Sequence, residues 1–485
     1  MSDMGLSIAA SGLNADTAEL NTASNNLSNI NTPGFAAEQV NLSPEAANGP
    51  FGVGQGVLVG SVTRLSDAVY VAANIAAQGV QGAASQTNTV MKSVESIFPE
   101  PSNSGIASQL STLWSDISTL ASNPNQVGSQ QAAVGAAQSV AAAISGSFSQ
   151  LSQLASSLQG QIGAGSNDGG WLSQSNVLLS QVAQLNAGIV AGASGGQDVN
   201  SLIDQSSAAV NKLAGLLGVT ATTASNGSIS VYLKGVQLVA GNVAQSLSAT
   251  GSATTVNLGI QTSSGISVEA GGSVGANIVA VNSTIPNYES KLNAVADSLA
   301  TGLNSLQANG MAANGDPGSA IAGGYTGIVL PNIFVNGGST TGYTTSSASF
   351  DSAATITVSP ALLGNPALVA TASAPGPSNS NTIGTPTLDG TNAQVMAALA
   401  SSTSGPDSLY QTMIGALGTQ ASNASTVAAA AVNLATTASN NISTVSGVNM
   451  NSEELKVLSA QNDFQAVSKV VNAITTSLQA LMAAV

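Results

Sequence analysis

Residues 457–485 read VLSAQNDFQAVSKVVNAITTSLQALMAAV, and this stretch decides how the chain is organised. Apolar residues recur in it every seven positions, and a second apolar line follows three residues later. This is the spacing of a helix that packs against another helix. An apolar strip of this length is not stable in water by itself, so the sequence predicts a helix that requires a partner. The first line consists of Val457, Phe464, Val471, Leu478 and Val485, and the second of Ala460, Val467, Ile474 and Leu481.

A weaker version of the same pattern lies at the amino end. It is interrupted at Asp16, and Gly12 lowers its helix propensity, so this helix depends on packing. Thr32-Pro33-Gly34 ends it, because proline disfavours helix at the preceding residue and glycine can adopt the positive φ of a turn. We predict that the two terminal helices pack on each other or on the same ends of other subunits; the alternative is a terminal helix packed on its own globular domain. The amino-terminal lines are Leu6, Leu13, Leu20 and Leu27, and Ala9, Ala23 and Ile30.

The composition excludes several classes of function. The 485 residues include 22 Asp or Glu, 7 Lys or Arg, no His and no Cys, with a net charge of -15. A serine triad, a cysteine nucleophile and an ordinary zinc site therefore cannot form. Nucleic acid and membranes are not expected partners, because there is no cationic surface and no apolar stretch of about 18 residues. We expect no catalysis, no cofactor and no metal.

The remaining motifs with possible chemistry have simpler interpretations. The glycines of 52–60 do not have the spacing of a phosphate-binding loop and have no Lys nearby, so they indicate a turn before a strand at 57–62. Glu453 and Glu454 are expected in the first turn of the last helix, where they favour the helix dipole, with Ser452 or Asn451 as N-cap. Neither motif predicts an active site.

The interior divides by hydrophobic period into helical and β-rich parts. Steps of three and four residues predict four helices over 86–217, and a period of two around Lys234-Gly235 predicts a hairpin. A further helix carries Pro286 near its beginning, as a kink or a true start. The predicted class is α+β, mainly α, with terminal helices in a coiled-coil-like core. The expected parts are 1–34 with 447–485 as this core; 35–85 as an extended connector; 86–220 with 276–314 and 392–446 as a helical middle domain; 221–275 as a β-hairpin segment; and 315–391 as a β-rich outer insertion with strands at 328–330, 333–335 and 356–358, for which disorder is the alternative.

Both ends resemble a known family. ASGLNADTAELNTASNNLSNINTPGF (10–35) is similar to the amino-terminal signature of bacterial flagellar axial proteins of the rod, hook and hook-filament junction, and SGVNMNSEELKVLSAQNDFQAVSKVVNAITTSLQALM (446–482) is similar to their carboxy-terminal signature. In the interior, DVNSLIDQSSAAVNKLAGLLGVTAT (198–222) and the order of elements resemble the junction members. Ala36, Ala37, Ser206 and Ser207 depart from the family's pattern, so polar contacts made there by relatives are not expected here.

The resemblance implies a structural subunit that is exported unfolded by the flagellar type III apparatus and assembles as a ring between hook and filament. It implies as partners further copies of the chain, the hook protein, a second junction protein towards the filament and an export chaperone. Alternatives are a hook or distal rod protein, or a secreted surface adhesin with coiled-coil ends. The residues expected in the assembly interface are Leu6, Leu13, Leu20, Leu27, Ile30, Pro33, Gly34, Phe35, Val457, Phe464, Val467, Val471, Ile474, Leu478 and Leu481.

Overall fold

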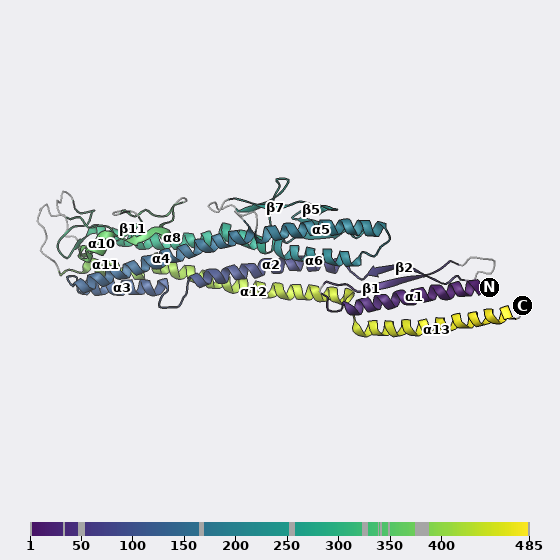
Figure 1. Ribbon diagram of the computed structural model, residues 1–485. Coiled ribbons are helices and arrows are strands. Elements are labelled where there is room, and N and C mark those ends of the chain that lie inside the picture. The colour runs from purple at the N-terminus through teal and green to yellow at the C-terminus, as the bar shows by residue number, and fades with distance from the viewer. Residues whose placement is uncertain are drawn as a thin grey trace.

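The computed structural model is an elongated, mainly helical molecule with both chain ends side by side at one end (Figure 1). It describes residues 2–32, 34–46, 54–163, 169–251, 258–322, 328–337, 339, 342–347, 350–373 and 388–483. The described helices of at least eight residues are α1 Ser2–Ser28, α2 Ala68–Ile97, α3 Ile106–Ser122, α4 Val127–Ile162, α5 Gly170–Ser194, α6 Asn200–Leu217, α7 Gly272–Val279, α8 Ile285–Asn309, α11 Thr391–Ala398, α12 Pro406–Ser446 and α13 Met450–Ala483.

The strands form small antiparallel sheets beside these helices. A four-stranded sheet has the order β3-β4-β5-β6, a three-stranded sheet has the order β7-β8-β9, and three further pairs are β1-β2, β10-β13 and β11-β12. Their bounds are β1 Glu38–Pro44, β2 Val57–Arg64, β3 Thr220–Thr223, β4 Ile229–Leu233, β5 Val236–Ala240, β6 Val243–Ala244, β7 Leu247–Thr250, β8 Gly259–Thr262, β9 Ser267–Val268, β10 Gly310–Ala312, β11 Phe334–Asn336, β12 Ile356–Val358 and β13 Ala370–Ser373.

The hairpin predicted around Lys234-Gly235 is confirmed. β4 pairs with β5, and Leu233 lies opposite Val236 across the turn. Lys234 and Gly235 both have positive φ, 47° and 86°, as a two-residue hairpin turn of the favoured twist requires.

Helix amides hold the sheets on the bundle. Asn186 of α5 accepts from the N–H of Ile229 and donates to its carbonyl, both at 2.8 Å. Asn304 of α8 accepts from Phe334 N–H and donates to Phe334 O, both at 2.9 Å. A primary amide offers the same donor and acceptor as a neighbouring strand, so each asparagine replaces a missing strand partner.

The main hydrophobic core runs through the bundle from α2 to α8 and includes the first half of α12. By length and composition α5, with a mean hydropathy of 1.3, could cross a membrane, but 39% of that window is buried inside the protein, where α5 packs on α4 and α6.

The contact between α2 and the second half of α12 is made of alanines. Ala77 clusters with Ala435 and Ala438, and Ala84 clusters with Ala428 and Ala431. Residue numbers rise along one helix as they fall along the other, so the two helices run antiparallel. We call this contact the alanine seam.

The connector predicted as extended over 35–85 is shorter than expected. α2 begins at Ala68, where the Asp67 carboxylate accepts from Val69 N–H at 2.7 Å and caps the helix. Its first half carries mostly Ala, Gly and Gln, so the apolar period is weak in the sequence although the helix packs through these small residues.

The N-cap of the last helix is Asn449, two positions before Asn451 and three before Ser452, the residues predicted. α13 begins at Met450, and Asn449 accepts from Ser452 N–H at 3.2 Å. Asn451 and Ser452 are therefore inside the helix. Pro286 lies in the first turn of α8, and a π-helical turn, Ala280–Thr284, joins α7 to α8 just before it, so the helical path continues through this point.

The segment 315–391 is less β-rich and less separate than predicted. Strands form at β11 and β12, but residues 328–330 contribute only an isolated bridge from Leu330 to Gly318. Phe334 and Leu362 are fully buried in the main core, and the short helix α9, Ser352–Thr355, packs on α4 and α8. The described part of the segment therefore packs onto the bundle through these residues, although Ile328, Leu363 and Leu388 remain exposed.

Candidate assembly interface

The two terminal helices form an antiparallel pair with one regular register. A methyl group on Gly5 would lie 3.2 Å from Ile474 Cδ1, and one on Gly12 would lie 3.6 Å from a Val467 methyl. Asn26 Nδ2 donates to Glu453 Oε2 at 3.1 Å. In each of these pairs the two residue numbers add up to the same value, so the register is constant from Gly5 to Asn26. Figure 1 shows α1 and α13 side by side.

Small residues make this contact possible. Gly5 and Gly12 face α13 directly, and Ala9, Ala23 and Ala460 are buried between the helices. Close approach through Gly and Ala buries little apolar area, so the pair contributes less stability than a leucine-lined contact would.

The leucine line of α1 therefore lies beside the contact. Leu6 and Leu13 each follow a contacting glycine by one residue, which is about 100° around a helix. They remain partly exposed, and Phe464 on α13 is 45% exposed. The predicted residues that are only partly buried are Leu6, Leu13, Leu20, Leu27, Ile30, Phe35, Val457, Val467, Val471, Ile474 and Leu478. We call this set, with Phe464, the apolar strip.

Three predicted interface positions are not part of the apolar strip. Gly34 is exposed and has a φ of 87°, as the predicted turn requires. Pro33, like Val485 of the heptad line, lies outside the described residues, and so does the side chain of Leu481.

A buried polar cluster anchors the pair at its bundle end. The Asn26 amide accepts from Glu38 N–H and donates to Glu38 O, both at 2.9 Å, while it also reaches Glu453. Lys456 Nζ donates to Glu453 Oε1 at 2.8 Å. Burial, and secondarily the charge of Asp198, raise the pKa of the Glu38 carboxyl. One asparagine thus joins α1, β1 and α13.

A second cluster joins the β1-β2 hairpin to the bundle. Arg64 at the end of β2 pairs with Asp204 of α6, and Asp204 also accepts from Ala36 N–H at 3.3 Å. Ala37 N–H donates to Ser446 O at 2.8 Å, at the end of α12. Burial raises the pKa of Asp204, and Arg64 acts in the opposite direction.

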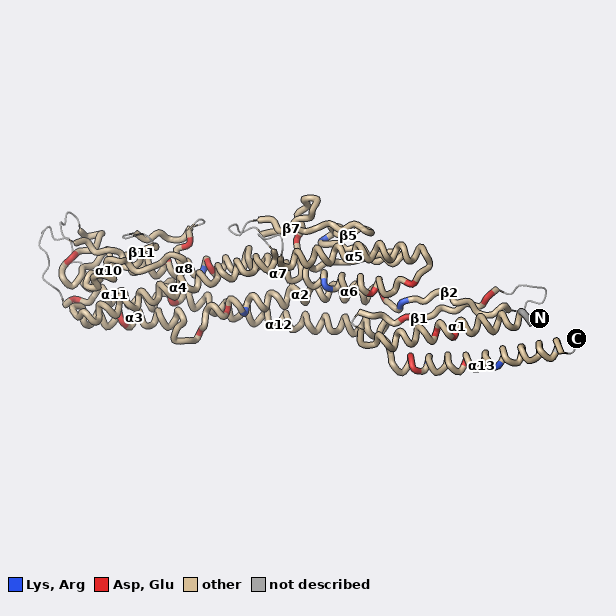
Figure 2. Tube along the Cα trace, in the orientation of Figure 1, with Lys and Arg blue, Asp and Glu red and all other residues tan. Residues whose placement is uncertain are grey.

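The sequence interpretation missed both clusters. The available signals were that Arg64 is the only arginine of the chain, and that Asn25 and Asn26 begin an asparagine-rich stretch at a predicted helix end. Arg64–Asp204 and Lys456–Glu453 are the two ion pairs among the described residues, and Figure 2 shows how sparse charges are along the whole trace.

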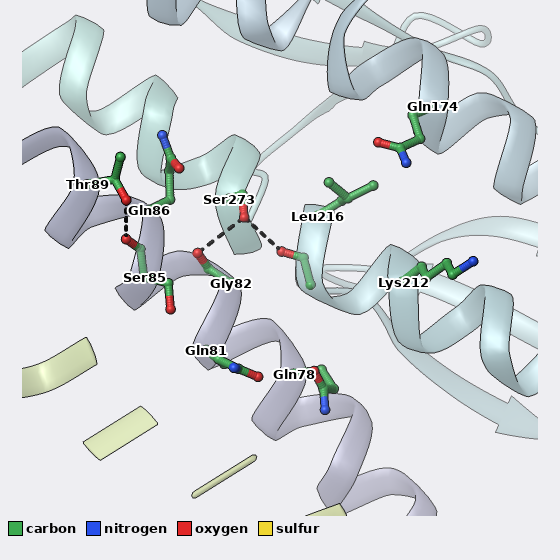
Figure 3. A pocket seen from close by; sticks show the side chains of 11 residues that line it. Gln78, Gln81, Gly82, Ser85, Gln86, Thr89, Gln174, Lys212, Leu216 and Ser273 are labelled. Atoms are coloured by element: carbon green, nitrogen blue, oxygen red, sulfur yellow. Dashed lines mark hydrogen bonds between the residues drawn. The ribbon is translucent and has the colours of Figure 1, made fainter. Parts of the chain in front are cut away.

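A polar groove of about 530 Å³ lies on the bundle between α2, α6 and α7 (Figure 3). Ser273 Oγ donates to the carbonyls of Gly82 and Gly215 at 3.2 and 3.3 Å. Of the lining side chains only Lys212 is charged, and the others are mainly amides and hydroxyls, so this set contains no acid and base pair. We assign no chemistry to the groove.

Two family profiles identify this long helical bundle with paired chain ends as a flagellar axial protein. A family profile described as "Flagella basal body rod protein" matches residues 6–35, and one described as "Flagellar hook-associated protein FlgK helical domain" matches residues 91–321. The chain is 26% identical over 357 residues to flagellar hook-associated protein 1 of Escherichia coli K12, covering 70% of this chain and 64% of that protein.

Further relatives agree with these matches. Flagellar hook-associated protein 1 of Salmonella typhimurium is 26% identical over 248 residues, covering 50% of this chain and 43% of that protein. The flagellar hook junction protein FlgK of Burkholderia pseudomallei has a similar fold, with a TM-score of 0.59 and 19% identity, covering 77% of this chain and all of that one. The alignments thus span less than two thirds of the curated relatives. The chain belongs to the flagellar hook-associated protein 1 family, a family of structural proteins of the hook-filament junction.

Proposed function

We propose that this protein is a structural subunit of the hook-filament junction of a bacterial flagellum and that it assembles through its paired terminal helices. The observation that carries the proposal is the apolar strip, which lies along both terminal helices and stays partly exposed after they have paired. A family of axial structural proteins supplies the context in which copies of such a strip become covered.

The strip can supply the free energy of assembly. Fully burying a Val, Leu, Ile or Phe side chain stabilises by roughly 1.5–3 kcal/mol, so covering the smaller part that is still exposed on each contributes roughly 0.5 kcal/mol. Summed over the strip, this amounts to roughly several kcal/mol per subunit. We infer that the terminal pair reaches its full stability only between subunits.

The partners proposed for the assembled state are further copies of the chain, the hook protein on one side and a second junction protein on the filament side. Before assembly, an export chaperone would cover the strip, because an exposed apolar surface of this length promotes aggregation. The proposed arrangement sets the terminal helices at the centre, the helical bundle around them and residues 315–391 farthest out.

Electron microscopy of a deletion strain tests the function. Hooks without filaments, with flagellin shed into the medium, are expected. Missing hooks would instead indicate a hook or rod protein, and a normal flagellum would indicate a surface adhesin.

A substitution tests the interface. Val471 lies in the middle of the α13 line of the strip, and Val471→Asp places an unpaired carboxylate there at a cost of several kcal/mol per subunit. Filament attachment should be lost. The matched control is Gln479→Asp, on an exposed position of the same helix away from the strip, which should attach filaments. Normal attachment with Val471→Asp, at equal export, would contradict the proposed interface.

A further inference from the structure

Two carboxylates face each other halfway along the terminal helix pair. Asp16 of α1 lies opposite Asp463 of α13 in the register set by Gly12 with Val467 and by Asn26 with Glu453. Asp16 Oδ2 is buried and has no hydrogen-bond partner. Burial, and then the charge of Asp463, raise the pKa of Asp16. Apart from Asn26 and Glu453 at the bundle end, the contact line named above consists of small and apolar residues, so this like-charged pair opposes pairing of the helices in a single subunit.

No base of the same subunit relieves the repulsion within the described part of the terminal pair. Lys456 is bonded to Glu453 at the bundle end, and Arg64 is bonded to Asp204. The nearest other charge on α1 is Glu19, which is acidic as well. Asp463 itself accepts only a long hydrogen bond of 3.4 Å from Ser459.

One cation of the terminal pair has no acidic partner among the described residues. Lys469 is exposed on α13 and appears in neither of the two ion pairs. It lies six residues after Asp463, which is about 240° around the helix and about 9 Å along it, so it points away from the Asp16 side. Leu455 and Leu458, 66% and 54% exposed, lie on the same outer side of α13.

We propose that Lys469 of one copy pairs with Asp16 and Asp463 of the next copy, so that the outer face of α13 docks against the terminal helix pair of its neighbour. This proposal rests on the proposed function and names the contact by which copies associate. The charges are complementary, and the exposed Leu455 and Leu458 become covered in the same step. Because two different faces meet, the contact is head to tail, which generates a ring or a helical array rather than a closed dimer.

Charge reversal tests the contact in flagella assembled by living cells. Lys469→Asp should abolish filament attachment, because three carboxylates then meet at one point. The double variant Asp463→Lys with Lys469→Asp restores opposite charges across the contact and should regain attachment. Normal attachment with Lys469→Asp would mean that a solvent counterion neutralises Asp16 and Asp463. Failure of the double variant to attach filaments would mean that Lys469 acts elsewhere. Either result overturns the proposal. The proposed function would fail separately, through normal attachment with Val471→Asp.

Disulfide trapping gives a second readout, since the chain has no cysteine of its own. Subunits with Asp463→Cys and Lys469→Cys, coassembled with unmodified subunits, should form dimers and longer ladders on mild oxidation. The two positions of one chain are too far apart to bridge, because a disulfide needs Cα atoms within about 7 Å. Replacing Lys469→Cys by Thr475→Cys, on another exposed face of α13, should give no ladder. A ladder no stronger than in this control would overturn the contact.

Discussion

The crossing of α2 and α6 offers a sharp test of the packing. A methyl group on Gly82 would lie 2.0 Å from the carbonyl oxygen of Gly215 and 2.8 Å from its carbonyl carbon. Both atoms belong to the backbone of a packed helix, so no side-chain rotation can relieve the overlap. Gly82→Ala must therefore push the two helices apart by at least about 1 Å, since real Cβ atoms essentially never approach another heavy atom within 3.0 Å.

The magnitude follows from two opposing terms. Overpacking of this kind costs about 1–3 kcal/mol, and more where backbone must move. Alanine in place of glycine inside a helix returns about 1 kcal/mol through its higher helix propensity. We expect a net loss of about 2 kcal/mol. For a cooperative unit of about 200 residues, each kcal/mol lowers Tm by roughly 2–4 °C, so Tm should fall by about 6 °C.

Gly135→Ala in α4 is the matched control. A methyl group there meets nothing within 4 Å, so only the propensity gain remains and Tm should rise slightly. Thermal unfolding followed by circular dichroism at 222 nm measures both variants. If Gly82→Ala raises Tm as Gly135→Ala does, α2 and α6 do not cross at this distance and the reasoning is refuted.

Three further predictions concern charge, the amide contacts and the junction. Acid should stabilise the folded protein, because a carboxyl with a raised folded-state pKa contributes stability that is complete below its unfolded pKa, near 4, and is lost as pH rises through the folded value. Tm should therefore be higher at pH 5 than at pH 7. Cooperative unfolding between pH 6 and 5 would contradict this. Asn304→Ala leaves the buried N–H and C=O of Phe334 unpaired and should lower the free energy of unfolding in urea by about 3 kcal/mol, whereas Asn309→Ala, at an exposed side chain, should change it by less than about 1 kcal/mol. Arg64→Ala removes the partner of Asp204 and should broaden the distribution of molecular lengths in small-angle X-ray scattering at unchanged helix content; an unchanged distribution would show that Arg64 does not hold the hairpin on the bundle. The carboxyls with raised pKa are Asp16, Glu38, Asp204, Glu289 and Asp407, in each case chiefly through burial, whereas the pKa of Asp389 is lowered, chiefly through its bond from Thr391 N–H.

Strong periodicity explains which elements could be predicted from the sequence. The heptads of α13, the apolar steps of α3 and the period of two in β4 and β5 each come from large apolar residues on one face. The structure has these elements where they were expected. The first half of α2 has no such residues at regular spacing. Its packing through Ala77, Gly79 and Gly82 depends on the small residues of α6 and α12, which one segment of sequence does not reveal.

The same limit applies to the candidate interface. The apolar lines of α1 and α13 are visible in the sequence because they are periodic. The line that α1 turns towards α13 contains Gly5, Gly12 and Asn26, which look like gaps in a pattern of leucines. The ties from Asn26 to Glu453 and from Arg64 to Asp204 join residues far apart in the chain, so only the folded backbone brings them together.

The alanine seam between α2 and α12 has a mechanical consequence. If α12 slid by one heptad, about 10 Å, Ala77 would meet Ala428 and Ala431, and Ala84 would meet Ala421 and Ala424. Each of these contacts of Ala77 and Ala84 would again join two alanines. The alanine seam therefore resists such sliding far less than interlocked leucines would. The stop lies at the other end of α12, where Asp407 accepts from Trp114 Nε1 at 2.7 Å and Tyr410 donates to Glu100 at 3.0 Å. We therefore expect the second half of α12 to slide along α2 under load more easily than its first half, and to return when the load is removed.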